Sequence, residues 1–300
     1  MTLGTIGCGK MGTTLIAGAI RAGIVAADAV IGCDPLPAAC EAFTEATGAR
    51  TTTDPAELAN ACEVILLCTM PLQAAEALRD AARAAAGQPR LVISIAAGIT
   101  RAPLEAACPE NFRVIRAMPN TPALVGQGAA AYCLGTRATP AGAGTAHTLL
   151  EAVGMALEMP ERFMNLVTGL SGSGPAYVYV VIEALADGGV LAGLTRAVSL
   201  RLAAQTVLGA AAMVLETNEH PAVLKDKVTS PGGTTIAGLA ELERLGLRTA
   251  LISAVNAASL RAAELGKASA CVEIPPQFST CEGLAMRVRD GRIHSCLRHF

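Results

Sequence analysis

The sequence has no tryptophan and few aromatic residues of any kind. Only 3% of its 300 residues are Phe, Trp or Tyr, whereas 52% are hydrophobic. Small and aliphatic side chains, alanine above all, therefore carry the apolar content, which favours helices that pack closely against one another. A chain of this length can bury a substantial core, and the usual size of domains predicts about two of them.

The chain also lacks an excess of either charge. Its formal net charge is -2 and its sequence pI is about 6.1. This balance excludes the strongly basic surface with which proteins hold nucleic acid or anionic membranes. We therefore expect a small-molecule substrate and further copies of the same chain as partners, and neither nucleic acid nor a membrane.

No uninterrupted apolar run approaches the roughly 20 residues of a membrane-spanning helix. The longest smooth apolar patch is Val207–Leu215. The N-terminus shows no basic region followed by an apolar run and a small-residue cleavage site, because Lys10 lies inside a glycine-rich loop. These features predict a cytoplasmic protein.

Cysteine and histidine patterns typical of metal sites are missing as well. The ten cysteines include no C-x-x-C pair and no cluster with histidine, so we expect no metal site. Several cysteines lie in apolar runs and resemble small buried hydrophobic residues, which suits a reducing cytoplasm. None of the four histidines is placed as a catalytic base, and His220 before Pro221 is typical of a turn.

A glycine motif follows the first expected strand. Leu3–Ile6 is a short apolar run, and Gly7, Gly9 and Gly12 come next in the pattern G-x-G-x-x-G, before an expected helix over 13–22. In that setting the first glycine makes a turn, the second admits a pyrophosphate, and the third lets the helix pack on the strand. The motif, with Lys10 and Met11 inside it, predicts a dinucleotide site.

Asp34 ends the next expected strand, Ala29–Cys33, twenty-two positions after Gly12. An acidic residue there can accept hydrogen bonds from the adenosine ribose, which favours NAD over NADP. The alternative is that Asp34 and Pro35 only begin a turn and cap the following helix. The sequence leaves both interpretations open.

Strands and helices continue to alternate to about residue 126. Apolar runs at 63–68, 91–95 and 112–116 end in turn residues: Thr69, Met70 and Pro71, then Ala97, then Met118 to Pro122. This alternation predicts a doubly wound parallel sheet of Rossmann type, whose ligands bind beyond the carboxyl ends of the strands. Further strands are expected at 126–134 and 155–159, with a helix over 139–152 between them.

After Pro160 the pattern becomes entirely helical. A Ser/Gly-rich turn is expected over 167–174, then a helix opened by Pro175 and a second helix capped by Thr195. Further helices are expected over 236–244 and 248–264. The long helices are apolar nearly all round, which is typical of helices buried against a partner subunit. We expect three parts: a dinucleotide-binding domain over 1–160, an all-helical dimerisation and substrate domain over 161–266, and an atypical tail over 267–300.

Two features of the helical half carry candidate chemistry. Ser230-Pro231-Gly232-Gly233-Thr234-Thr235 precedes the helix over 236–244. It is either a turn whose hydroxyls cap that helix or a site that binds an anion through the open N–H groups of the helix. Glu183 and Asp187 share a helix face, where they are either an acid–base pair or a structural one.

Read as a whole, the chain resembles the pyrroline-5-carboxylate reductase family. The resemblance covers residues 1 to 266 in uninterrupted order. Six segments carry it: Ile6–Gly12 (IGCGKMG), Val92–Ile99 (VISIAAGI), Arg116–Gly126 (RAMPNTPALVG), Leu170–Val190 (LSGSGPAYVYVVIEALADGGV), His220–Asp226, and Val228–Leu239 (VTSPGGTTIAGL).

The resemblance implies reduction of the cyclic imine 1-pyrroline-5-carboxylate to L-proline by NADPH or NADH, the last step of proline biosynthesis. It implies a homodimer in which helical domains interlock, and which can assemble further into rings. It also implies site residues. Gly7, Gly9 and Gly12 hold the pyrophosphate; Ala97, Met118, Asn120 and Thr121 flank the nicotinamide; Ser230, Gly233, Thr234 and Thr235 bind the substrate carboxylate; the Thr235 hydroxyl is a candidate proton relay.

The sequence departs from the family at two places. Met70 stands where the family usually has a lysine before the proline, so a cation near the cofactor phosphates is lost. Together with Asp34 this favours NADH. The tail from Lys267 to Phe300 resembles nothing in the family, and we expect it to be either disordered or a loosely packed extension and not a further site.

Three other interpretations compete with the reductase interpretation of the sequence. A β-hydroxyacid dehydrogenase shares the domain order but uses a helix lysine, and no lysine occurs between Lys10 and Lys225. The others are a reductase of a related cyclic imine carboxylate and a cofactor-binding homologue without turnover.

Overall fold

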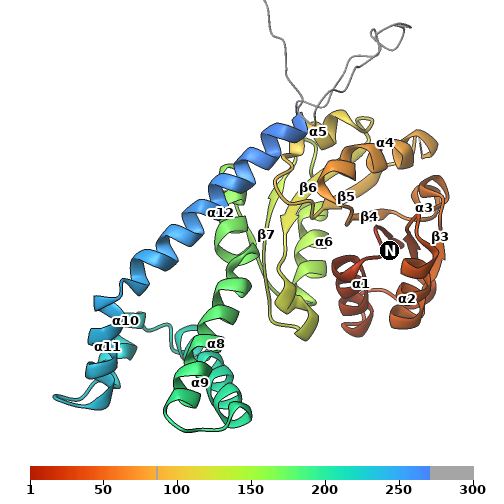
Figure 1. The fold of residues 1–300 in the computed structure, drawn as a ribbon. Helices are drawn as coiled ribbons and strands as arrows, with labels where there is room; N and C mark the ends of the chain where they lie inside the picture. The colour runs from red at the N-terminus through yellow and green to blue at the C-terminus, as the bar shows by residue number, and fades with distance from the viewer. Residues whose placement is uncertain (86, 271–300) are drawn as a thin grey trace, which may run out of the picture.

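The structure is a computed structural model that describes residues 1–85 and 87–270. An eight-stranded sheet with helices on both faces forms the first half, and a long helical arm forms the second (Figure 1). The predicted tail lies outside the described residues from position 271 onward. The last helix continues past position 266, so residues 267–270, the first of the expected tail, belong to α12.

The strands and helices of the first half alternate as the hydrophobic pattern predicts. Their bounds are β1 Leu3–Ile6, α1 Lys10–Arg21, β2 Val30–Cys33, α2 Pro37–Thr47, β3 Arg50–Thr52, α3 Pro55–Ala61, β4 Val64–Leu67, α4 Ala74–Ala84, β5 Arg90–Ser94, α5 Arg101–Ala106, β6 Phe112–Met118, β7 Gly128–Leu134, α6 Pro140–Glu151 and β8 Gly154–Glu158, with short 3₁₀ helices at Ala27–Ala29, Pro71–Gln73, Thr121–Val125 and Glu161–Phe163.

The strand order is β3-β2-β1-β4-β5-β6-β7-β8. The first six strands are parallel, so the doubly wound sheet is confirmed, with its order reversing between β1 and β4. β7, however, runs antiparallel to β6, and β8 runs parallel to β7. The reason is connection length: only nine residues join β6 to β7, whereas a parallel crossover needs a dozen or more.

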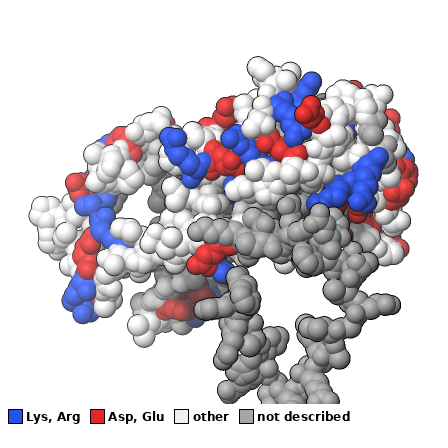
Figure 2. Space-filling model, turned by 90° about the horizontal axis from the view of Figure 1, so that it is seen from above, with Lys and Arg blue, Asp and Glu red and all other residues white. Residues whose placement is uncertain are grey.

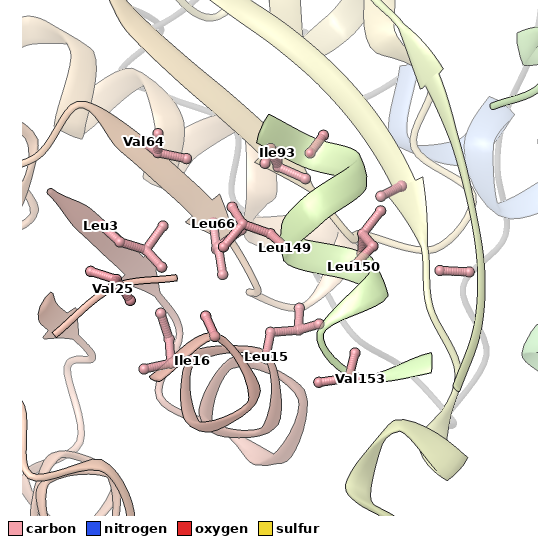
Figure 3. Close-up of a cluster of buried hydrophobic side chains, with 14 of the residues drawn as sticks. Leu3, Leu15, Ile16, Val25, Val64, Leu66, Ile93, Leu149, Leu150 and Val153 are labelled. Carbon is pink, nitrogen blue, oxygen red and sulfur yellow. The ribbon is translucent and has the colours of Figure 1, made fainter. Parts of the chain in front are cut away.

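The sheet buries apolar side chains on both faces within one chain. On one face Leu3 and Leu66 pack against Leu15 and Ile16 of α1 and Leu149 of α6 (Figure 3). The other face packs against α3, α4 and α5 through side chains that include Leu58, Leu78 and Leu104. This double cover explains why the strands are almost continuously apolar instead of alternating.

The second half is helical, as predicted. Its elements are α7 Met164–Val167, the π-helix η5 Thr168–Gly172, α8 Gly174–Leu191, α9 Arg196–Thr217, α10 Pro221–Lys227, α11 Thr234–Arg244 and α12 Leu247–Ala270. The expected Ser/Gly-rich turn over 167–174 is wrong, because those residues continue the helix as a π-turn in which Ser173 N donates to Thr168 O at 2.8 Å. Thr195 caps α9 as predicted by accepting a hydrogen bond from Val198 N.

The helices α8 and α9 leave most of their apolar surface uncovered in one chain. By length and composition alone, Glu161–Leu191 and Arg196–Thr217 are apolar enough to cross a membrane, and only 6% and 11% of their most apolar windows is buried. The expectation that no segment is long enough is therefore wrong on this measure. A sequence count ends each apolar run at the first polar residue. A helix with a few polar residues can still be apolar on average over 18 or more positions.

Candidate active site

The carboxyl ends of five parallel strands meet in one row. The register aligns Cys33 with Ile6, Ile6 with Leu67, Leu67 with Ser94, and Ser94 with Arg116. The residues just beyond this row are the predicted cofactor contacts: Gly7, Asp34, Thr69, Met70, Pro71, Ala97 and Met118. Because parallel strands point the same way, the structure brings these residues to one edge of the sheet.

The three glycines of the loop fit the roles that the motif assigns to them. Gly7 has φ +103°, and a Cβ atom on it would lie 2.6 Å from the Cys68 carbonyl oxygen. A Cβ atom on Gly12 would lie 2.2 Å from the Gly7 carbonyl oxygen, so α1 can approach β1 only with glycine at this position. Gly9, in contrast, is exposed and has open space around its Cα. The loop therefore offers free backbone at its middle position, as a bound pyrophosphate requires.

Asp34 is half-buried and accepts two backbone hydrogen bonds. Its Oδ2 accepts from Cys8 N inside the glycine loop at 2.9 Å, and its Oδ1 accepts from Leu36 N at 3.0 Å. Asp34 thus begins a turn, as one interpretation expected, but it does not cap α2, whose N-cap is Leu36 without a side-chain hydrogen bond. Each carboxylate oxygen has a second lone pair, so the same geometry leaves acceptor capacity for a ribose hydroxyl.

The turn after β4 carries an unpaired hydroxyl. Thr69 Oγ1 is buried and has no hydrogen-bond partner in the structure. A buried hydroxyl without a partner is costly, and a polar ligand at this edge would satisfy it. Met70 is 70% exposed and gives the turn an apolar surface where a cation was expected from the family. With the open backbone at Gly9, this hydroxyl shows that the residues present fit a dinucleotide.

The Asn120 side chain makes two hydrogen bonds within the protein. Its side-chain amide donates to Ser171 O at 3.0 Å and accepts from Ala129 N at 2.8 Å, which joins β7 to the π-helix. Thr121 is exposed beside it, and Ala97 and Met118 are half-buried. A Cβ atom on Gly172 would lie 2.6 Å from the Met118 methyl group, so Met118 can pack closely against the π-helix only because residue 172 is glycine. The carboxyl end of β6 and the residues that follow it are thus packed against the π-helix η5.

The loop before α11 differs from the capping prediction. The N-cap is Gly233, with φ -79° and ψ 178°, and no side chain caps the helix, so the expected hydroxyl cap is wrong. Gly233 N donates to Ser230 O at 3.1 Å, and Gly232 has φ +67°. This tight turn leaves the first N–H groups of α11 without a side-chain acceptor, which is the arrangement that binds an anion.

The two candidate halves of the site lie far apart in a single chain. In Figure 1 α10 and α11 lie at the lower left, at the far end of α12 from the sheet. The other end of α12 packs on the β5 turn, where a Cβ atom on Gly98 would lie 3.0 Å from Ala262 O. The Ser230–Thr235 loop, a candidate anion-binding loop, therefore lies far from the row of strand ends that carries Gly7, Asp34 and Thr69, which we call the dinucleotide edge.

Comparison with known proteins decides the family. Residues 161–265 match the model for pyrroline-5-carboxylate reductase dimerisation, and residues 2–98 match the model for NADP oxidoreductase, coenzyme F420-dependent. A pyrroline-5-carboxylate reductase of Synechocystis sp. is 47% identical over 265 residues, which cover 88% of this chain and 98% of the relative. The chain belongs to the pyrroline-5-carboxylate reductase family.

Solved structures agree with this assignment. A pyrroline-5-carboxylate reductase from Coxiella burnetii superposes with a TM-score of 0.82 at 34% identity, covering 88% of this chain and 98% of that one. A pyrroline carboxylate reductase from Plasmodium falciparum, solved with NADP bound, gives a TM-score of 0.80 at 32% identity, covering 89% and 98%. Membership of the pyrroline-5-carboxylate reductase family removes the β-hydroxyacid dehydrogenase rival.

One feature at the joint between the two halves was missed from the sequence. Arg116 of β6 is 2% exposed, and its guanidinium donates to Asn165 Oδ1 at 2.9 Å and lies 3.7 Å from Glu161 Oε1. Glu161 also accepts from Arg101 N at 2.7 Å and pairs with Arg101 Nε at 3.0 Å. The signal was Arg116 within a mainly apolar strand, where Arg113 is the only other charged residue; a buried cation needs an acidic partner.

Burial lowers the pKa of the Arg116 guanidinium, while Cys133 and Glu161 act in the opposite direction. The guanidinium remains charged at neutral pH because an arginine starts from so high a pKa. Glu161 therefore joins a buried cation of the sheet to the first turn of the helical half.

Other titratable candidates have structural partners. Asp187 pairs with Arg196 across the corner between α8 and α9, so the structural interpretation holds for this member of the Glu183–Asp187 pair. His220 caps α10 by accepting from Ala222 N through Nδ1, as a turn residue does. Among the residues that the structure describes, no group of three or more His, Cys, Asp or Glu side chains is arranged to hold a metal ion.

Proposed function

We propose that this chain reduces 1-pyrroline-5-carboxylate to L-proline with NAD(P)H as the hydride donor, the last step of proline biosynthesis. Membership of the pyrroline-5-carboxylate reductase family over nearly the whole chain carries the proposal. The dinucleotide edge and the anion-binding loop support it, because they match the two things that such a reductase must hold: a nucleotide cofactor and a carboxylate substrate.

The cofactor edge supplies binding and orientation. Gly9 leaves room for the pyrophosphate, Thr69 offers its unpaired hydroxyl, and Ala97 and Met118 lie at the strand ends beside which we place the nicotinamide ring. When bound, NAD(P)H supplies the hydride. The residues of the chain hold the nicotinamide, which donates the hydride, at a fixed position relative to the imine carbon, which accepts it. This fixed geometry lowers the entropic cost of bringing the two molecules together.

The loop before α11 holds the substrate in this proposal. Its carboxylate binds the open N–H groups of Thr234 and Thr235, where the helix dipole favours negative charge, and the Ser230 hydroxyl adds a further donor. A protonated imine is already electrophilic at its C=N carbon, so no histidine or metal is needed to activate it. One proton must reach the ring nitrogen, and we assign its delivery to the Thr235 hydroxyl, directly or through water.

The site is completed by a second copy of the chain. Two observations support this: α11 lies at the far end of α12 from the dinucleotide edge (Figure 1), and α8 and α9 expose apolar surface that one chain leaves uncovered. We place the α8–α9 surface against another subunit and not in a membrane. Acidic and basic side chains are interspersed on the face seen in Figure 2. We propose a homodimer as the minimal unit, able to assemble further into larger rings.

The first experiment measures oxidation of NADH and NADPH in the presence of 1-pyrroline-5-carboxylate. We expect turnover with at least one of them, and we expect Ser230→Ala to raise KM for the imine more than it lowers kcat. A folded oligomer that oxidises neither cofactor would instead support a non-catalytic homologue. Turnover only with another cyclic imine carboxylate would support that alternative.

The proton relay is tested with Thr235→Ala and Thr235→Val. Removal of the hydroxyl should lower kcat in both variants, with little change in the binding of the cofactor. If Thr235→Ala retains the turnover of the parent and Thr235→Val changes only the binding of the imine, the relay is assigned to the wrong residue.

Mixing two impaired variants tests the shared site, with the assay run at an imine concentration so far below the KM of Ser230→Ala that this variant contributes little turnover. Ser230→Ala damages the anion loop and Gly9→Val blocks the dinucleotide edge. If each site takes one half from each subunit, random exchange between the two variants restores about a quarter of the parent activity, because half of the dimers are mixed and each has one intact site. A site contained in one chain would give no recovery after mixing.

We also propose the cytoplasm as the working compartment. Buried free thiols such as Cys8, Cys33 and Cys62 support this choice, because a reducing environment keeps them unpaired.

A further inference from the structure

The part of the dinucleotide edge around Asp34, where the adenosine of a bound cofactor is expected, is strongly acidic. From Asp34 to Ala61, a segment that the structure describes in full, the chain carries five carboxylates, Asp34, Glu41, Glu45, Asp54 and Glu57, against a single cation, Arg50. This segment forms α2, β3 and α3 and lies beside the end of β2. It is the part of the molecule next to which the ribose of a bound dinucleotide lies in folds of this type.

The single cation of this segment is already paired. Arg50 Nη1 lies 3.0 Å from Glu57 Oε1, at the start of β3. Glu41 and Glu45 line a groove between α2 and the end of β3, together with Thr52. Lys10 is exposed at the first position of α1, inside the glycine loop, where the pyrophosphate is expected. The acidic segment therefore offers no free positive charge of its own.

Asp34 is held firmly at the centre of this acidic surface. Cys8 N of the glycine loop and Leu36 N of the following turn fix its two oxygens at 2.9 and 3.0 Å. Asp34 N in turn donates to Thr52 O at the end of β3 at 3.3 Å. Each oxygen of this fixed carboxylate keeps a further lone pair, which can accept a hydrogen bond from a donor but can only repel an anion.

We propose that Asp34 makes this chain selective for NADH over NADPH. The ribose 2′- and 3′-hydroxyls of NADH donate to the fixed carboxylate. NADPH carries a 2′-phosphate at that place, with a charge of about -1.5 to -2 near neutral pH. That charge meets Asp34 and the acidic segment with no neighbouring arginine to receive it, whereas NADP-binding sites of this fold supply one. The inference rests on the proposed function only in assuming a nicotinamide dinucleotide.

The test measures binding, so it needs no turnover. Isothermal titration of the full-length protein compares NADH with NADPH, and then 5′-AMP with 2′,5′-ADP (adenosine 2′,5′-bisphosphate), which differ only by the 2′-phosphate. We expect the ligand without the 2′-phosphate to bind about tenfold more tightly or better in both pairs, because like charges within a few ångströms repel strongly where water is partly excluded. Equal or tighter binding of the 2′-phosphorylated ligands would overturn the proposal.

Two variants locate the effect. Asp34→Asn removes the charge while its amide oxygen can keep one of the two backbone bonds; we expect the preference to shrink severalfold. Leu36→Arg adds a cation at an exposed position in the same turn, and we expect it to tighten binding of 2′,5′-ADP but not of 5′-AMP. Since Leu36 is on the surface, this variant tests the proposal even if Asp34→Asn folds poorly.

Glu110→Gln is the matched control. It removes one acidic charge at an exposed turn just before β6, at the amino ends of the strands and so away from the dinucleotide edge. It should leave both pairs of affinities unchanged. An unchanged preference in Asp34→Asn and Leu36→Arg, with both variants folded, would show that other residues set it. Selective NADH binding without imine reduction would refute the proposed function and leave the present inference standing.

Discussion

The sheet half and the helical half of this chain are both rich in apolar residues, yet they place them differently. In the sheet half, Leu3, Ile16 and Leu66 are at most 2% exposed between strands and helices of the same chain (Figure 3). In the helical half, Val180, Leu191 and Leu208 are 64%, 91% and 60% exposed. The sheet is covered on both faces by its own crossover helices, whereas α8 and α9 cover mainly each other.

The comparison shows which half can be stable by itself. Burying one large aliphatic side chain contributes about 1.5–3 kcal/mol, and the sheet half gains this within one chain. The helical half gains it only when something else covers α8 and α9. The residues from 161 to 265 match a family dimerisation model, and we propose another subunit as that cover. The same association would bring the loop before α11 to a dinucleotide edge.

The largest expected effect comes from breaking the association. Val180→Asp combined with Leu208→Asp places charges on the exposed faces of α8 and α9. We expect a monomer whose activity falls by about 100-fold or more, because both the fold of the arm and the shared site depend on the partner. Light scattering after gel filtration gives the mass, and cofactor oxidation gives the activity.

The control for this variant is Arg79→Asp, which changes the charge of an exposed residue on α4 in the sheet half. It should remain an active oligomer. A fully active monomer from the double variant would mean that one chain contains a complete site.

The next effect separates two glycines of one loop. Gly12→Ala forces a Cβ atom to within 2.2 Å of the Gly7 carbonyl oxygen, so we expect it to lower the free energy of unfolding by about 2–3 kcal/mol. Gly9→Ala meets nothing within 4 Å, and we expect a change of about 0.5 kcal/mol or less with a clear loss of dinucleotide affinity.

Urea denaturation and dinucleotide titration measure the two effects. Equal destabilisation by the two substitutions would contradict the assignment of Gly12 to packing and Gly9 to the ligand.

A smaller effect is expected where the two halves join. Glu161→Gln removes the carboxylate beside the buried Arg116, and we expect a loss of about 2 kcal/mol of stability, since Asn165 still accepts from the guanidinium. In an Arg116→Met background the same substitution should cost clearly less. Independent, additive costs in this double-mutant cycle would show that the pair is not coupled.

The smallest effect concerns buried thiols at alkaline pH. Burial raises the pKa of Cys62 from 9.0 to about 12, and the same cause raises that of Cys33 to about 12. In the unfolded chain these thiols ionise near pH 9, so their contribution to stability is fully present below pH 9 and is lost between pH 9 and about 12. The loss should reach about 1 kcal/mol per thiol at pH 10.

Urea midpoints measured from pH 7.5 to 10.5 check this expectation. Cys62→Ala should flatten the decline above pH 9 without changing the shape of the curve below pH 8.5. An identical alkaline decline in the parent and the variant would place the titrating groups elsewhere.

Much of the fold followed from local patterns. The apolar runs at 3–6, 64–67 and 91–94 became β1, β4 and β5, and Thr195 and Pro175 mark helix starts as expected. The short edge strand β3 was not predicted, because Arg50–Thr52 carries no apolar run. The direction of β7 was not predicted either, since it depends on how short a connection must close on the sheet.

The residues of the candidate site likewise divide into those that local sequence predicted and those that only the tertiary structure revealed. The sequence by itself determined the glycine loop, the acidic residue after β2 and the glycine-rich turn before α11, because each depends on residues that are close in the chain. Only the tertiary structure decided that Asp34 is held by Cys8 N, that Asn120 joins β7 to the π-helix, and that Arg116 meets Glu161. Apart from the bond between Asn120 and Ala129, nine positions apart, these contacts join residues 26 or more positions apart, and no local spacing records which distant partner a buried polar group finds. The separation of the Ser230–Thr235 loop from the dinucleotide edge is of the same kind, because the length and direction of α12 set it.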